Sequence, residues 1–260
     1  MTGSVALTCA QRDGRSYLSR IRYDGLSRVS RPQRAGDAAH VVLAHLGPGV
    51  IGGDRYALDV RVEPDASLLV TGQMATPVYA RDASSSVDAS WQVAGGASLV
   101  VRSEPVMLDA GARHDMRTAL DVAGDGRAIL ADVVTVPPTA RARLRTIVRI
   151  DGTIVVRDAC DLHGIAGAVA TVIIACPGPE RRERIIEALA PLVASTEGAI
   201  GGIGGSADVV IVRARSEAVW GLQQRVASLI AAATRGLRWR TIGKTFPSIP
   251  GPLEKEASRL

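Results

Sequence analysis

Along most of the chain, hydrophobic and polar positions alternate with a period of two, which is typical of β-strands. From about residue 17 to residue 176, short apolar or β-branched segments follow one another, separated by Gly, Asp and Pro. The clearest strands are predicted at 67–70, 98–101, 128–134, 145–150, 153–156 and 169–175. Many short strands with frequent turns, and without helices between them, predict a mainly β fold: a sandwich, a barrel or a solenoid.

The Asp151-Gly152 pair is a strong hairpin signal. It separates the apolar runs 145–150 and 153–156. A two-residue Asp-Gly loop between two apolar runs predicts a β-hairpin, because both residues tolerate the positive φ angles of a tight turn.

Two helices are predicted in the last third of the chain. The first begins near Pro179, since proline fits the first helical position. The second follows Ser216, a residue type favoured at the N-cap, and Gly236 suits its end. Apolar residues fall on one face of each helix: Ile185, Ile186, Leu189, Leu192 and Val193 in the first, and Val219, Leu222, Val226, Leu229 and Ile230 in the second.

The remaining C-terminal segments contain no helical pattern. Residues 198–205 include five glycines and are predicted to form a flexible loop, whereas 209–212 is predicted to be a strand. The tail 247–260 is rich in proline, then charged, and is expected to be loose. No repeat of fixed length is visible in the sequence.

The glycine cluster 47–56 partly matches a nucleotide-binding motif. Gly47, Gly49 and Gly52 match the dinucleotide-binding pattern G-x-G-x-x-G. That motif requires a helix immediately afterwards, because the helix N-terminus binds the pyrophosphate. Residues 58–63 instead alternate as a strand does. The cluster is therefore interpreted as a glycine-rich turn between two strands.

Composition limits the classes of function. The chain has 260 residues, of which 47% are hydrophobic and only 3% aromatic, so Val, Leu, Ile and Ala must fill the core. The net charge of +5 favours an acidic partner surface. The N-terminus lacks the apolar run of a secretory signal, and the longest apolar stretch, 168–176, is too short to span a bilayer. Three scattered cysteines favour a reducing cytoplasm.

Local motifs for enzymatic chemistry are incomplete. Cys160, Asp161, His163 and Cys176 are metal-ligand types, but a structural zinc site needs a second close pair of ligands. No G-x-S-x-G elbow is present, which leaves a Ser-His-Asp triad without its usual motif. Gly243-Lys244-Thr245 resembles the end of a phosphate-binding loop, but Arg238 stands where the first glycine should be.

Two arginine clusters remain. Arg141, Arg143 and Arg145 would share one face of a strand, and Arg181, Arg182 and Arg184 lie at the start of the first helix. They indicate a solvated face or a contact with an acidic protein or nucleic acid. Scarce aromatic residues and lysines favour a protein.

Four blocks in order resemble the family of urease accessory proteins UreD, also called UreH. They are Gly-Pro-Gly-Val-Ile-Gly-Gly-Asp-Arg-Tyr (47–56), Val-Thr-Gly-Gln-Met-Ala-Thr-Pro-Val-Tyr (70–79), the pair 96–99 and 104–109, and Ala-Asp-Val-Val (131–134). The resemblance covers residues 15 to 160 well. It departs from the family at Pro77, where a lysine is usual, and at Arg143, where an acidic residue is usual.

The resemblance implies a single UreD-like domain over 1–260, with solenoid-like, β-helical strands and two helices in the C-terminal third. It implies no catalytic residue, no permanently bound cofactor and no resident metal. Such proteins bridge apo-urease to the accessory protein UreF and, through UreF, to the GTPase UreG. Nickel is expected to pass through the interior in transit to the urease active site. The helices near 180–193 and 217–235 would be docking elements.

The motif matches select six residues for the nickel path or for partner binding: Asp54, Arg55, Gln73, Thr76, Tyr79 and Asp109. For Asp54 the alternative is a turn or cap residue. The resemblance further implies that Arg143 would place a charge that repels cations near the path. No binding to nucleic acid or to a membrane is expected.

Two other functions remain open at this stage. One is a β-rich hydrolase of unknown substrate that uses Asp and His, for which the sequence offers no paired motif. The other is a basic module that binds nucleic acid through its arginine faces; steep loss of binding with salt would support it.

Overall fold

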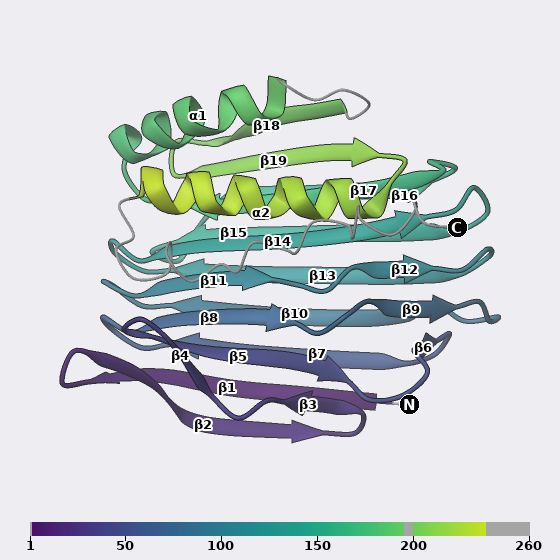
Figure 1. Ribbon diagram of the computed structural model, residues 1–260, viewed down its shortest axis with the longest axis horizontal. Coiled ribbons are helices and arrows are strands. Elements are labelled where there is room, and N and C mark those ends of the chain that lie inside the picture. The colour runs from purple at the N-terminus through teal and green to yellow at the C-terminus, as the bar shows by residue number, and fades with distance from the viewer. Residues whose placement is uncertain (1, 195–199, 238–260) are drawn as a thin grey trace, which may run out of the picture.

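The computed structural model describes residues 2–194 and 200–237. The chain winds into a β-solenoid of about 4 turns, and two helices pack on one side of it (Figure 1). The mainly β, solenoid-like fold with two C-terminal helices, which the sequence predicted, is confirmed.

The elements follow the chain in this order: β1 Thr2–Arg12, β2 Arg15–Asp24, β3 Ser27–Val29, β4 Gln33–Ala35, β5 Ala38–His45, β6 Val50–Ile51, β7 Arg55–Val62, β8 Ser67–Gly72, β9 Thr76–Tyr79, β10 Ser85–Val93, β11 Ser98–Arg102, β12 Val106–Leu108, β13 Arg113–Val122, β14 Arg127–Val136, β15 Arg141–Ile150, β16 Thr153–His163, β17 Gly167–Ala175, α1 Pro179–Ala194, β18 Ile200–Ser206, β19 Val209–Ser216 and α2 Val219–Gly236.

The strands form two sheets that face each other. Sheet A has seven strands in the order β16-β15-β13-β10-β7-β1-β2. Sheet B has twelve, with β18-β19-β17-β14-β11-β8-β5-β3 as its main path and β4, β6, β9 and β12 beside it. The central strands of both sheets are parallel, because the chain alternates between the sheets once per turn.

The register shows a structural repeat. In sheet A, Leu58 lies beside Ala89, Ala89 beside Thr118, and Thr118 beside Thr146, so successive partners are 31, 29 and 28 residues apart. The turns share a pattern of buried and exposed positions, but equivalent positions carry different residue types. The sequence therefore shows no repeat of letters.

The main core lies between the sheets. Alternate residues of each strand point inward, and stacking the turns aligns them into apolar columns. One column runs through Val62, Val93, Val122 and Ile150. Leu99 faces it from sheet B and is fully buried. Aliphatic columns of this kind fill most of the core, since the chain has few aromatic residues.

The helices cover the outer face of sheet B (Figure 1). The residues of sheet B that point away from sheet A, including Val100, Ile129 and Ile174, form a second core with the helices. The large buried helix residues are Ile185 and Leu189 in α1 and Leu222, Val226, Leu229 and Ile230 in α2, where Ala232, Ala233 and Thr234 are buried as well. The predicted apolar stripes of both helices therefore pack on the sheet, with Ile186, Leu192, Val193 and Val219 half-buried at their margins.

Local predictions can be compared with the structure. β15 and β16 form the predicted antiparallel hairpin, and Asp151 and Gly152 take φ angles of 48° and 77°. The predicted loop 198–205 is wrong over its described part, because residues 200–206 form β18, an edge strand paired with β19. Glycine residues reach this conformation because the neighbouring backbone supplies the hydrogen bonds.

The N-cap of α2 also differs from the prediction. β19 continues to Ser216, which pairs with Ala168 of β17, so the helix begins only at Val219 with Ala218 as its N-cap. The Ser216 hydroxyl accepts a hydrogen bond from the Ala218 N–H at 3.2 Å. The tail 247–260 and the segment 243–245 lie outside the described residues. Neither helix in the described ranges is long and apolar enough to cross a membrane.

Shortening a fully buried inward residue should destabilise the whole solenoid. We expect Leu99→Ala to lower the free energy of unfolding by about 3 kcal/mol, because it leaves a cavity between the sheets. Ile154→Ala, at a side chain that is 37% exposed on β16, should cost about 1 kcal/mol or less. Urea denaturation of both variants measures the difference, and equal losses would contradict this assignment of the core.

Candidate functional site

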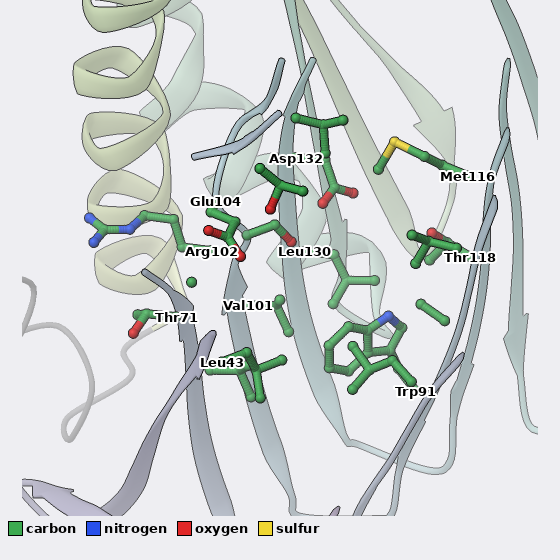
Figure 2. Close-up of a pocket in the computed structure, with 18 of the residues that line it drawn as sticks. Leu43, Thr71, Trp91, Val101, Arg102, Glu104, Met116, Thr118, Leu130 and Asp132 are labelled. Atoms are coloured by element: carbon green, nitrogen blue, oxygen red, sulfur yellow. The ribbon is translucent and has the colours of Figure 1, made fainter. Parts of the chain in front are cut away.

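A cavity of about 180 Å³ lies inside the solenoid, between the two sheets (Figure 2). Trp91 and Leu130 contribute to its apolar wall from opposite sheets. Its polar lining includes the side chains of Thr76, Ser103, Glu104, His114, Thr118 and Asp132. A cavity with carboxylates and an imidazole in its lining differs from the aliphatic core around it, so these groups require an explanation.

Asp132 enters the cavity from the middle of β14. Ala128, Leu130 and Val134 share its parity and are buried, so its carboxylate also points inward, as Figure 2 shows. Asp132 is half-buried and belongs to the lining of the cavity. Enclosure raises the pKa of the Asp132 carboxyl, and a hydrogen bond from Ser103 opposes the increase.

Glu104 follows β11 and lies next to Gly72, the last residue of β8. Burial raises the pKa of the Glu104 carboxyl from 4.5 to about 7, against the effect of a hydrogen bond from Thr76. A Cβ atom at position 72 would stand 2.5 Å from the Glu104 backbone nitrogen. Glycine at 72 therefore allows the two segments to approach and holds Glu104 at the cavity wall.

His114 is buried on β13, with 2% of its surface exposed. Its Nδ1 lies 2.8 Å from the Ser85 hydroxyl, and its Nε2 has no hydrogen-bond partner among the described residues. Burial lowers the pKa of the imidazole to about 4. At neutral pH the ring is therefore uncharged and retains ligand capacity.

A groove of about 410 Å³ lies outside the cavity, beside α2. Gly72, Arg102, Ser103 and Glu104 line both the groove and the cavity, so these residues form the wall between them. The Arg102 side chain extends toward α2, on the outer side of sheet B (Figure 2).

The groove has apolar side chains that solvent reaches. Trp220 of α2 is 70% exposed and Met74 is 85% exposed, and Met107, Pro105 and Val219 line the groove beside them. We name this surface the α2 groove. Large apolar side chains gathered on one surface mark a site of interaction with another molecule.

The polar groups of the cavity come from several strands and the segments between them. In the described part of the chain, no three His, Cys, Asp or Glu side chains gather closely enough to form a metal cluster. Asp132, Glu104 and His114 can each offer a ligand side chain to a divalent cation. They therefore provide single ligands and do not form a closed metal site.

Of the six residues selected from the sequence, only Thr76 lines the cavity. Asp54 is 3% exposed, and its Oδ2 accepts a hydrogen bond from the Ile51 N–H at 3.1 Å, within its own turn. The Tyr79 hydroxyl donates to the Pro48 carbonyl at 2.9 Å, across the glycine cluster. Arg55, Gln73 and Asp109 are exposed and lie outside the cavity lining.

Asp132, Glu104 and His114 were not selected from the sequence. Asp132 carried a usable signal, because it is the only charged residue in the apolar run 128–134. A charge at an inward strand position is costly unless it has a function or a partner. Glu104 and His114 lack such a signal, because only the turns of the solenoid bring them to the same cavity.

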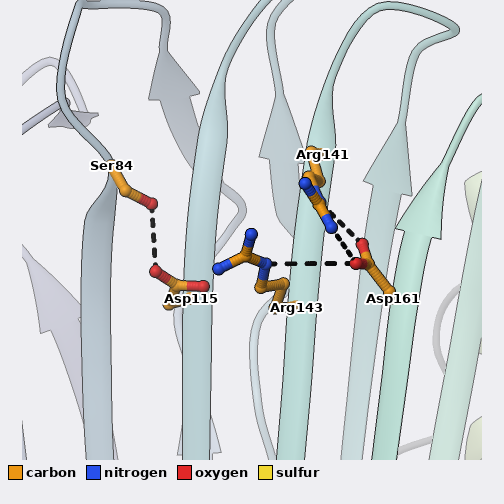
Figure 3. A network of polar contacts seen from close by, with 5 residues as sticks. All are labelled: Ser84, Asp115, Arg141, Arg143 and Asp161. Atoms are coloured by element: carbon orange, nitrogen blue, oxygen red, sulfur yellow. Dashed lines mark hydrogen bonds and ion pairs between the residues drawn. The ribbon is translucent and has the colours of Figure 1, made fainter.

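Arg143 lies away from the cavity. Its neighbours Ala142 and Leu144 are buried, so Arg143 points to the outer face of sheet A. Its Nε lies 4.0 Å from Asp161 Oδ2 in the network that Figure 3 shows. The charge at position 143 therefore does not line the interior, where the sequence comparison had led us to expect it.

Comparison with known proteins matches residues 1–248 to the family model described as UreD urease accessory protein. The chain is 34% identical over 159 residues to urease accessory protein UreD of Kocuria rhizophila, covering 57% of this chain and 44% of that protein. It is 31% identical over 200 residues to UreD of Sorangium cellulosum, covering 74% and 61%. In both cases the match spans less than two thirds of the relative's length.

Neutralising Glu104 should change the pH dependence of stability. Because its folded-state pKa is raised, its contribution to stability is fully present below pH 4.5 and is lost as pH rises toward about 7. We expect Glu104→Gln to be more stable than wild type at pH 8 by about 1 kcal/mol, after allowance for solvent screening, and similar to it at pH 4.5.

Denaturant melts at the two pH values measure this difference. Glu187→Gln, which removes an exposed carboxylate on α1, is the control and should show no such divergence. A Glu104→Gln variant that is equally or less stable at pH 8 would contradict the burial of this carboxyl.

Proposed function

The chain belongs to the UreD family of urease accessory proteins, and we propose that it serves urease maturation by conducting nickel through the interior cavity. In this proposal the protein is a scaffold without catalytic activity of its own. It works in the reducing cytoplasm that its cysteine usage favours.

The observation that carries this proposal is the set of ligand atoms enclosed in the solenoid. Asp132 presents a carboxylate to the cavity, and the buried Nε2 of His114 has no partner among the described residues. Both groups are costly to enclose in an apolar core. A passing divalent cation would offset that cost, because it binds carboxylate oxygen and neutral imidazole nitrogen.

The protonation states suit a cation that enters and leaves. Burial raises the pKa of the Asp132 and Glu104 carboxyls, so each holds its proton more tightly than in water. An arriving cation favours the ionised form of a carboxyl and releases the proton. Because this exchange weakens net binding, nickel would be held briefly at each position.

The neighbouring groups would position the ligands. Ser103 donates to Asp132, and Thr76 donates to Glu104. Glu104 belongs to the wall shared with the α2 groove, so it is the carboxylate that would meet a cation arriving from that side. Thr76, which the motif match selected for the nickel path or partner binding, would in this proposal position Glu104.

The α2 groove supports a docking role. We assign it to the accessory protein UreF, through which the GTPase UreG would deliver nickel, while apo-urease would bind elsewhere on the solenoid. Its exposed Trp220 and Met74 fit an apolar anchor of a partner protein. Docking at this groove would place the partner next to Glu104.

The nickel path can be tested in cells that carry urease and the other accessory proteins. We expect Asp132→Asn to reduce urease activity at limiting nickel by about tenfold, the scale typical of a perturbed metal site. Asparagine keeps an acceptor for Ser103, so the fold should remain stable. Asp121→Asn, on the outer face of sheet A beside Arg149, should retain wild-type activity.

Co-purification with the accessory proteins and thermal melting show that the Asp132→Asn variant is folded and assembled. Full urease activity of this variant at limiting nickel would rule out a path past Asp132.

The docking assignment has a separate test. Trp220→Ala should reduce recovery of UreF in pull-downs by about tenfold or more, as expected when an exposed aromatic anchor is removed. Tyr17→Ala removes an exposed aromatic side chain from β2, far from α2 in Figure 1, and should leave recovery unchanged. Equal recovery with both variants would show that UreF binds elsewhere.

A further inference from the structure

A polar pocket of about 420 Å³ opens on the outer face of sheet A, where β13 and β15 begin and β16 ends. Its lining includes Ser84, Arg113, Asp115, Thr139, Arg141, Arg143 and His163, and we name it the arginine pocket. The arginine side chains are carried at the outward parity of their strands, so the pocket and the interior cavity lie on opposite sides of the sheet. His114 lines both the pocket and the interior cavity, and it is the one residue of the pocket that the proposed nickel path uses.

The parallel register of the solenoid builds this pocket. Arg113 lies beside Arg141, and Arg141 lies beside His163, so three basic residues form one row across adjacent strands. Neighbouring strands are about 4.8 Å apart. Like charges directly opposite each other on a sheet destabilise it. The row therefore needs negative charge nearby.

The row of residues two positions further along these strands, Asp115, Arg143 and Asp161, supplies part of that negative charge. Arg143 lies between Asp115 and Asp161 in the register, as Figure 3 shows. Arg141 binds Asp161 through two hydrogen bonds, one of them from Nε to Oδ1 at 2.8 Å, and lowers the pKa of that carboxyl. The Ser84 hydroxyl donates to Asp115 at 3.1 Å.

A surplus of positive charge remains. Three guanidinium groups face two carboxylates, and Arg141 already occupies Asp161 with a bidentate pair. Among the described residues Arg113 has no ion pair, and Arg143 reaches Asp161 only at 4.0 Å. The guanidinium groups of Arg113 and Arg143 thus have N–H donors available for an anion.

We propose that the arginine pocket binds a phosphate-type oxyanion, either free phosphate or the phosphate group of a small ester. Guanidinium groups bind phosphate oxygens in bidentate geometry. Arg113 and Arg143 supply these forks, and the His163 imidazole adds an N–H donor at the end of the row. The bound anion neutralises the cationic row that the register creates.

The character of the lining favours a small anion over a macromolecule. Every exposed large hydrophobic residue of the described chain lies outside this lining, so the pocket lacks the apolar centre of a protein interface. Phe, Tyr and Trp are also missing from the lining, so bases of a nucleic acid would have no stacking platform.

Isothermal titration of the full chain with inorganic phosphate, at ionic strength matched with chloride, tests the site. We expect saturable 1:1 binding, and Arg113→Gln and Arg143→Gln should each weaken it by about tenfold, the value of one lost charge-assisted contact. Arg145→Gln is the matched control, because Arg145 lies on the same face of β15 but outside the pocket. Thermal melts without phosphate confirm that each variant is folded.

A second titration with adenosine monophosphate distinguishes the two sources of the anion. Competition between the ester and phosphate shows that the pocket accepts a phosphate group on a larger molecule, whereas binding of phosphate alone limits it to the free ion. Absence of saturable phosphate binding, or equal affinity in wild type and both pocket variants, would overturn the proposal. A titration with an acidic peptide that binds more tightly than phosphate would overturn it in favour of a protein partner.

Discussion

The in-register stacking of parallel strands is the constraint on which the structure depends. Leu58, Ala89, Thr118 and Thr146 lie side by side in four neighbouring strands. Because side chains alternate along a strand, this register decides for each remaining position whether its side chain points to the interior or to the outer face. Backbone hydrogen bonds between turns fix this assignment, and a shift of one residue would expose a whole apolar column. The core, the cavity and the arginine pocket are three consequences of the same register.

The cavity shows how the fold tolerates polar groups inside this arrangement. Asp132 occupies an inward position of β14 between Leu130 and Val134, and it receives a hydrogen bond from Ser103. Gly72 brings Glu104 to the same wall by omitting a side chain. Surrounding aliphatic columns and the helices over sheet B supply the stability that these enclosed carboxyls reduce. The titratable groups Glu104, His114 and Asp132 are thus gathered in one section of a largely aliphatic interior.

The features that depend on residues adjacent in the sequence could be predicted. Alternation located the strands, and Asp151-Gly152 identified its hairpin, because a turn depends on adjacent residues. Residues 200–205 were wrongly predicted to be a loop, since their strand conformation is imposed by pairing with β19 and not by propensity. The cavity could not be predicted for the same reason: Thr76, Glu104, Asp132 and His114 meet only through turns of about 30 residues. Motif matching instead selected residues such as Asp54, which accepts a hydrogen bond within its own turn.

The turn of 28 to 31 residues also sets a ruler along the solenoid axis. Each turn interacts mainly with the turns on either side, so inserting or deleting one whole turn preserves the register of the rest. Such a change would move the N-terminal end relative to the helices by one strand spacing, about 4.8 Å. The distance between surfaces at opposite ends of the molecule is therefore quantised in strand spacings, and evolution or protein engineering can adjust it in whole turns.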